Sequence, residues 1–282
     1  MQRLAEFSLR GPVYAIGVAV GGMLVPFLFW IGAAVAGLVT MRLGAAEGLK
    51  VGLWALLPGV AWLVWGLDPA PLAVLLLTLT MSLVLRVTVS WEKALLTGAL
   101  VSIGLAQSIP VLAADFFALL MEAAEASYSE LESSLGEQAA LKASGDGLRA
   151  MMLAATGFFL YALAVLSTGL ARGWQARLFN PGGFRREFHN FRLSSPAAVA
   201  LLVVMATAPS LGLNATMTVS ILAMPLSLAG LSLVHGLIAG RGLGDGWLIG
   251  FYLALVLLTP WLFFVLMMAA VIDSWFDFRK RH

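Results

Sequence analysis

The sequence predicts an all-α fold, a polytopic bundle of transmembrane helices with one amphipathic acidic helix outside the membrane. First, hydrophobic residues make up 61% of the 282 residues and charged residues 11%, whereas soluble domains are roughly 45–50% apolar and about 25% charged. Second, the mean hydropathy is +0.94, and apolar runs recur near the length of about 20 residues that a spanning helix needs. Third, the charges gather between these runs. Lipid must therefore solvate much of the apolar surface.

Eight apolar runs can be distinguished along the chain, and they predict about 8–10 membrane crossings. They cover residues 12–41, 49–67, 70–85, 94–114, 148–171, 196–213, 217–239 and 247–272. The run 70–85 is short enough to be tilted or partly interfacial. The first and last runs are long and carry central prolines, Pro26 and Pro260, so length leaves open whether each is one kinked helix or two short ones.

The placement of Arg and Lys favours two helices in the run 12–41. Short loops rich in these residues stay on the cytoplasmic side. A tight pair turning at Pro26 gathers the basic connections on one side: the N-terminus, 42–50, 86–93 and 172–192. A single span would put either the N-terminal arginines or the 172–192 segment outside. The same argument divides the run 247–272 at Pro260, so we expect both termini to be cytoplasmic.

Residues 115–147 are predicted to form the acidic extramembrane helix. The segment holds seven acidic residues against one lysine, Lys142. Apolar residues recur there every three or four positions, which is typical of an amphipathic helix, and Ser144-Gly145-Asp146-Gly147 ends it. The helix is expected to lie over the outer face of the bundle; a lid over a cavity and a docking helix are the alternatives. The chain then divides into a six-helix bundle (1–171), a basic loop (172–195) and C-terminal helices (196–282).

The segment Arg172–Arg192 carries five of the 17 Lys and Arg residues. Its first part, with Arg172, Trp174 and Arg177, suits lipid headgroups just beyond a span. A compact turn at Asn180-Pro181-Gly182-Gly183 follows, because proline disfavours helix before it and glycine permits positive φ. An interfacial helix is then expected, with one apolar and one basic face. The residues of these two faces are Phe184, Phe188 and Phe191, and Arg185, Arg186 and Arg192.

Two roles are open for this basic segment. It can fix topology and anchor the chain at the membrane, or it can dock a cytoplasmic partner. A phosphate-ligand site is the least favoured reading, because Pro-Gly-Gly lacks the Lys and Ser/Thr of a phosphate-binding loop. The C-terminal residues Asp273, Trp275, Asp277 and Arg279 are likewise expected to anchor a membrane exit. The two aspartates share a helix face and are expected to pair with Arg279 or with the basic segment.

Polar residues at membrane depth are the candidates for substrate binding. Gln107 and Ser108 lie beside Pro110, Asn214 lies between two runs, and His235 lies near the end of another. Polar groups beside prolines can mark broken helices that line a substrate site, or they can satisfy backbone groups that a proline frees. The sequence has no cysteine, no HExxH, no G-x-S-x-G and no Walker A motif. We therefore expect no enzyme activity, no metal, no cofactor and no nucleic-acid partner.

Four segments carry a resemblance to a known family: 38–44 (LVTMRLG), 85–91 (LRVTVSW), 171–188 (ARGWQARLFNPGGFRREF) and 272–279 (IDSWFDFR). With them the chain resembles the YybS-like family of predicted bacterial inner-membrane proteins, whose function is unknown. That family is similar to the substrate-binding subunits of energy-coupling-factor vitamin transporters, which are six-helix proteins that carry a small ligand and associate with a coupling subunit and ATPases. The spans up to Ala171 fit that architecture, but several further spans follow Ser195. No ligand motif matches, so no ligand residues are carried over.

The sequence thus leads us to expect a solute-binding or transport-related integral membrane subunit without its own ATPase, in the bacterial inner membrane. Its partners are expected to be the lipid bilayer and another membrane or cytoplasmic subunit. The alternative is a membrane scaffold or assembly partner that transports nothing. A transport subunit should enclose a cavity that Gln107 or Asn214 faces, whereas a scaffold should have a solidly packed bundle.

Overall fold

The computed structural model describes residues 2–65, 68–135, 145–259 and 261–281. These residues form thirteen α-helices and no strand, so the predicted all-α class is confirmed for this part of the chain. Five helices are long and apolar enough to cross a membrane, or up to seven if each of two bent pairs is one span. The chain therefore has the make-up of a multi-pass membrane protein, while the predicted count of eight runs is not confirmed.

The five long helices are α4 (Ala45–Val64), α5 (Ala70–Thr88), α6 (Trp91–Leu112), α8 (Gly145–Phe179) and α11 (Ala215–Gly240). The other α-helices are α1 (Gln2–Ser8), α2 (Pro12–Leu24), α3 (Phe29–Leu43), α7 (Ala114–Leu135), α9 (Gly183–Asn190), α10 (Ser195–Thr207), α12 (Asp245–Leu257) and α13 (Trp261–Phe276). Two short 3-10 helices complete the chain, η1 (Ala208–Leu211) and η2 (Phe278–Arg281).

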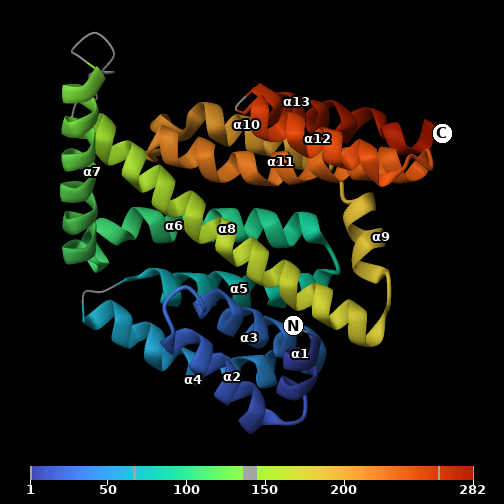
Figure 1. The fold of residues 1–282 in the computed structure, drawn as a ribbon, viewed down its shortest axis with the longest axis horizontal. Coiled ribbons are helices and arrows are strands. Elements are labelled where there is room, and N and C mark those ends of the chain that lie inside the picture. The colour runs from blue at the N-terminus through green and yellow to red at the C-terminus, as the bar shows by residue number, and fades with distance from the viewer. Residues whose placement is uncertain (1, 66–67, 136–144, 260, 282) are drawn as a thin grey trace.

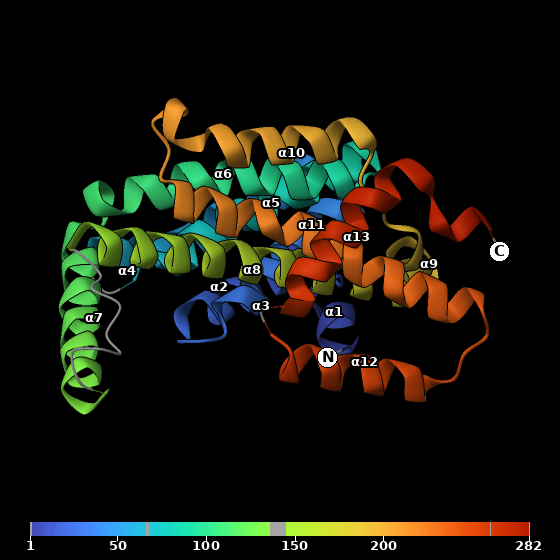
Figure 2. The same ribbon diagram turned by 90° about the horizontal axis from the view of Figure 1, so that it is seen from above.

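The bundle has two chemically different ends. Figures 1 and 2 show α1, α9 and the C-terminal helix η2 towards one end, while α7 lies across the opposite end. We call the first the basic end, because its connections contain most of the 17 Lys and Arg residues. Hydrogen bonds join its segments: the Arg86 guanidinium donates to the Met41 carbonyl at 2.6 Å, and that of Arg279 donates to the Phe191 carbonyl at 2.9 Å. Helices α1, α9 and η2 thus lie towards the same end of the bundle (Figure 1).

The run 12–41 is a helical hairpin, so the predicted break at Pro26 is confirmed. Val25 is extended (φ −94°, ψ 124°), because a following proline disfavours the helical conformation. Helices α2 and α3 pack tightly, and a Cβ added at Gly32 would lie 2.6 Å from the Ala19 carbonyl oxygen. With 13 and 15 residues, both helices are shorter than the roughly 20 residues of a full crossing.

The second long run also forms two helices, α12 and α13, bent by 120° at the break between them. Pro260 itself lies outside the described residues. Helix α13 packs on α11, and Gly230 lets the two helices approach, because an added Cβ there would overlap the Leu266 carbonyl. No described residue of α12 is buried, and Figure 2 shows this helix standing apart from the bundle.

Helix α8 differs from the sequence prediction, because it continues past Ala171 to Phe179. The residues between them are mostly good helix formers, and only Asn180-Pro181 stops the helix. Helix α7 covers Ala114–Leu135, which includes much of the predicted segment 115–147, and the prediction that this whole segment is an amphipathic acidic helix outside the membrane is not confirmed. Residues 136–144 of that segment lie outside the described residues. Phe117 joins α7 to the start of α8, where the Arg149 guanidinium lies 5.1 Å from its ring centroid.

Candidate functional site

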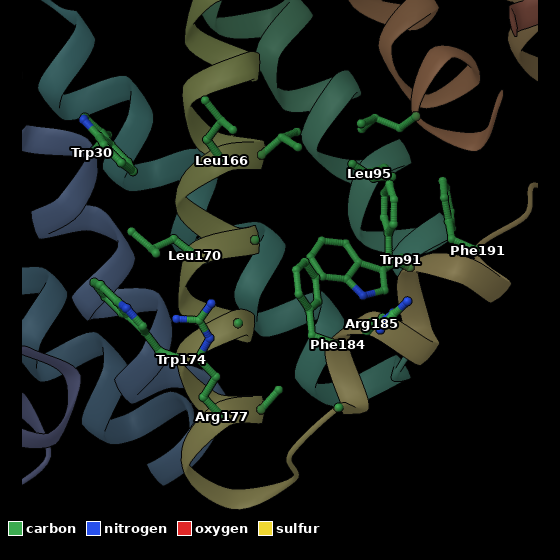
Figure 3. Close-up of a pocket in the computed structure, with 17 residues that line it drawn as sticks. Trp30, Trp91, Leu95, Leu166, Leu170, Trp174, Arg177, Phe184, Arg185 and Phe191 are labelled. Atoms are coloured by element: carbon green, nitrogen blue, oxygen red, sulfur yellow. The ribbon is translucent and has the colours of Figure 1, made fainter. Parts of the chain in front are cut away.

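The candidate site is a groove along one face of α8, with a volume of about 720 Å³. It lies towards the basic end and is open along one side. Its walls come from α3, α6, α9 and α11, as Figure 3 shows in close-up for most of them. The lining residues are Trp30, Trp91, Leu95, Val165, Leu166, Gly169, Leu170, Gly173, Trp174, Ala176, Arg177, Gly182, Phe184, Arg185, Phe188, Phe191 and Leu228.

Two glycines of α8 leave the face of this helix that forms the floor of the groove without side chains. A Cβ added at Gly169 would meet no atom within 4 Å, so this position faces open space. At Gly173 the nearest atom would be Phe184 Cδ1 at 3.8 Å. The two glycines are four residues apart and therefore lie on the same face of the helix. Side chains here would fill the groove without disturbing the packing of α8 on its neighbours.

Aromatic rings form the two walls. Figure 3 shows Trp30 and Trp174 on one side of α8, and Trp91, Phe184 and Phe191 on the other. The rings of Trp91 and Phe184 lie 6.0 Å apart between centroids.

Trp174 is 2% exposed, and its indole Nε1 has no hydrogen-bond partner among the described residues. A buried donor without a partner is uncommon in proteins, because it loses its hydrogen bonds to water.

Helix α9 closes the groove at the basic end, and one carboxylate holds it there. The Glu187 side chain accepts two hydrogen bonds from the Arg172 guanidinium of α8, one of them 2.9 Å long. It also accepts a bond of 3.2 Å from the Trp91 indole of α6. Gly182 enters α9 with a φ of 78°, a left-handed conformation that favours glycine. The predicted compact turn is thereby confirmed, and α9 is fixed to both walls.

Two guanidinium groups are the only charges among the residues that line the groove. Arg177 and Arg185 are both exposed, and neither makes a hydrogen bond or ion pair with a residue that the structure describes. In Figure 3 the Arg177 side chain extends from the end of α8 into the groove. The groove is thus apolar along its length and cationic at one end.

A second pocket of about 530 Å³ adjoins the groove between α9, α11 and α12. It shares Phe184, Arg185 and Phe188 with the groove and adds His189 and His235; we call it the histidine pocket. The two imidazole rings lie 6.1 Å apart between centroids. The His235 Nε2 atom forms a hydrogen bond of 2.8 Å with the Tyr252 hydroxyl.

Burial, and then the positive charge of Arg185, lower the pKa of His189 below its ordinary value. Its imidazole is therefore neutral at pH 7 and can donate or accept a hydrogen bond. Among the described residues that line the histidine pocket none is acidic. The pocket therefore presents two imidazole rings, which can donate or accept a hydrogen bond, and one full positive charge, that of Arg185.

The C-terminal residues form a lock beside this site. Asp273 is 1% exposed and pairs with Arg279 at 2.7 Å. Arg192 pairs with Asp277 at 3.3 Å, as the sequence predicts for the basic segment and the tail. Trp275 is 52% exposed. We call these two ion pairs the C-terminal lock. They join α13 and η2 to the connection between α9 and α10, and so help to hold the end of α9 in place.

The other predicted residues are scattered. Gln107 is exposed on α6, and the Ser108 hydroxyl donates to the Leu105 carbonyl at 2.7 Å. Asn214 caps α11, because its side chain accepts from the Met217 amide at 2.9 Å. None of these three lines the groove or the histidine pocket, whereas His235 lines the latter.

The basic segment contributes several residues to the groove itself. The predicted residues of this segment that line the groove are Trp174, Arg177, Phe184, Arg185, Phe188 and Phe191. The others act around it: Arg172 and Arg192 form ion pairs, Asn180 and Pro181 form the turn, and the Arg186 guanidinium contacts the Asn180 side chain at 3.4 Å.

Sequence reasoning missed Trp30, Trp91, Leu228 and the two floor glycines. The available signal was weak: Gly169 and Gly173 recur at helical spacing on either side of Arg172, which is also a common packing pattern in membrane helices. Among the described residues no group of three or more His, Cys, Asp or Glu side chains could hold a metal ion. No protein-family model matches the chain, and neither a curated protein nor a solved structure matches it.

Proposed function

We propose that the protein is a solute-binding or transport-related membrane subunit without its own ATPase, and that it binds an amphipathic ligand in the α8 groove. One observation carries the proposal: the groove is apolar and aromatic over its length, and its only charged lining residues, Arg177 and Arg185, stand unpaired. Its volume of about 720 Å³ falls within the roughly 300–1,000 Å³ that small-molecule sites occupy.

The membrane placement belongs to the same proposal. The long helices run between the two ends of the bundle (Figure 1), so the bilayer would surround their middle. Basic connections favour the cytoplasmic side, which places α9 and both termini inside. The bilayer in this proposal is the bacterial inner membrane, and the acidic helix α7 would lie outside it on the side opposite α9.

The groove has the length of one leaflet. From Val165 to Arg177 the floor covers thirteen residues of α8, and the twelve steps between them make about 18 Å at roughly 1.5 Å per step. Half of a hydrocarbon core of about 30 Å is about 15 Å. A ligand in the groove would therefore lie beside the acyl chains of the cytoplasmic leaflet, with its polar group at the headgroup level.

Apolar contact alone gives little selectivity in this setting. Lipid tails are as apolar as leucine side chains, so moving a chain from bilayer to groove gains no hydrophobic free energy. Selectivity must come from the close fit against the rings and from the unpaired arginines. The alternative scaffold role and the absence of enzyme activity stay predictions.

The test uses a pair of matched glycine variants. Gly169→Leu would place a side chain into the groove, whereas Gly104→Leu adds the same side chain on α6, where a Cβ likewise meets no atom within 4 Å. Native mass spectrometry in mild detergent would measure bound lipids and small amphiphiles. We expect wild type and Gly104→Leu to retain a bound amphiphile and Gly169→Leu to lose it. Equal retention by all three proteins would contradict the proposal.

A further inference from the structure

The histidine pocket continues the groove and gives its ligand a place for a polar group. Phe184, Arg185 and Phe188 line both spaces. A chain that lies along α8 would therefore reach Arg185 with its polar end. From there the pocket extends between α9 and α11 towards His189 and His235.

The groups around this polar end suit an anion with several oxygens. The Arg185 guanidinium is exposed and has no partner among the described residues, and guanidinium groups bind phosphate and carboxylate through paired donors. His189 and His235 line the same pocket, and a neutral imidazole can donate one ring N–H. The nearby Glu187 carboxylate does not compete for these donors, because Arg172 and Trp91 already occupy it.

A phosphate-type head fits better than a single carboxylate. A phosphate group presents several strong acceptor oxygens, whereas a carboxylate presents two that lie in one plane. The groups around the pocket come from two helices, Arg185 and His189 from α9 and His235 from α11. The pocket also lies at the basic end, where lipid phosphates would lie if that end faces the headgroups.

We propose that the ligand is a phospholipid with an anionic phosphodiester head, held with the phosphate at Arg185 and the histidine pocket and one acyl chain along α8. This inference rests on the proposed function, because it assigns the chemical class of the ligand in the same groove. It commits to a membrane lipid as the source of the phosphate.

The test compares ligands that share parts of this structure. Phosphatidylglycerol, diacylglycerol with the same chains, phosphatidylcholine with the same chains, and inorganic phosphate would each be titrated into delipidated protein. We expect phosphatidylglycerol to bind about tenfold or more tightly than diacylglycerol, since charge-assisted bonds favour the anion. We also expect it to bind more tightly than phosphatidylcholine, whose phosphate is offset by an attached cation.

Variants test which residues give the preference for phosphatidylglycerol over diacylglycerol. Arg185→Gln should remove the preference for phosphatidylglycerol over diacylglycerol. Lys93→Gln should keep it, because Lys93 is an exposed cation at the same end but outside both spaces. His189→Gln should reduce it. Unchanged melting temperatures in detergent would show that the variants are folded.

The possible results distinguish a failure of the phosphate inference from a failure of the proposed function. Equal affinity for phosphatidylglycerol and diacylglycerol in wild type would overturn the phosphate inference, while a loss of both in Gly169→Leu would leave the proposed function standing. Inorganic phosphate that displaces phosphatidylglycerol would overturn the assignment to a lipid. Binding of both lipids that Gly169→Leu leaves unchanged would refute the proposed function itself.

Discussion

Glu187 on α9 and Arg172 on α8 form an ion pair that joins the two helices. The carboxylate accepts two hydrogen bonds from this guanidinium and a third, at 3.2 Å, from the Trp91 indole. The Glu187 side chain thus joins α9 to α8, which forms the floor of the groove, and to α6, which forms one wall. The position of Arg185 and Phe184 depends on this contact, because both lie on the same short helix.

Glu187→Gln should loosen α9. The variant leaves the Arg172 side chain, which is 16% exposed, without its counter-charge, and we expect a loss of roughly 1–3 kcal/mol in stability. Melting in detergent measures this loss. Glu47→Gln is the matched control, since its partner Lys50 is 62% exposed and an exposed pair contributes about 0–1 kcal/mol. Equal losses of stability in the two variants would show that Glu187 does not hold α9 against α8 and α6.

Asp273→Ala should destabilise the C-terminal lock strongly. It leaves the Arg279 guanidinium, whose side chain is 13% exposed, without a counter-charge, and breaking a buried pair costs roughly 3–5 kcal/mol. Lys280→Ala removes a pair whose lysine is 82% exposed and should change stability by about 1 kcal/mol or less. Thermal unfolding in one detergent would compare them, and similar melting temperatures would contradict the lock.

Gly32→Ala should weaken the α2–α3 hairpin. Its Cβ would lie 2.6 Å from the Ala19 carbonyl oxygen, so the helices would have to separate. Gly17→Ala lies in the same hairpin, and its Cβ would meet no atom within 4 Å. Because alanine is the better helix former, Gly17→Ala should keep or raise the melting temperature while Gly32→Ala lowers it. The opposite order would show that the hairpin packs differently.

The sequence predicts those features that depend on local chemistry. The break at Pro26 and the turn at Gly182 follow from what proline and glycine do to the backbone, and both are found. The extension of α8 is not predicted, because arginines after an apolar run indicate a loop, whereas here no residue between Ala171 and Asn180 stops the helix.

The groove could not be predicted in this way. Trp30 and Trp91 are far apart in the sequence, and they line one space only because α3 and α6 both pack on α8. Periodicity identifies which face of a helix is apolar, but in a membrane chain nearly every face is apolar. The pattern therefore does not say which faces meet and which leave a groove between them.

Single cysteines would test the threading of the chain, which has no natural cysteine. Ser127→Cys places a thiol on the exposed part of α7, and Asn190→Cys places one at the end of α9. An impermeant thiol reagent added to intact cells should label the first and not the second. Labelling of Asn190→Cys alone would reverse the proposed orientation.

The most direct test of the account is to map where a bound lipid lies. Phosphatidylglycerol with a photoreactive diazirine at the end of one acyl chain would be cross-linked to the protein, and the labelled peptides identified by mass spectrometry. We predict labels around Trp30, Leu166 and Leu228, which line the groove, and we predict that unlabelled phosphatidylglycerol suppresses them. Labels spread evenly over the exposed faces of α4 and α12, without enrichment in the groove, would contradict the account.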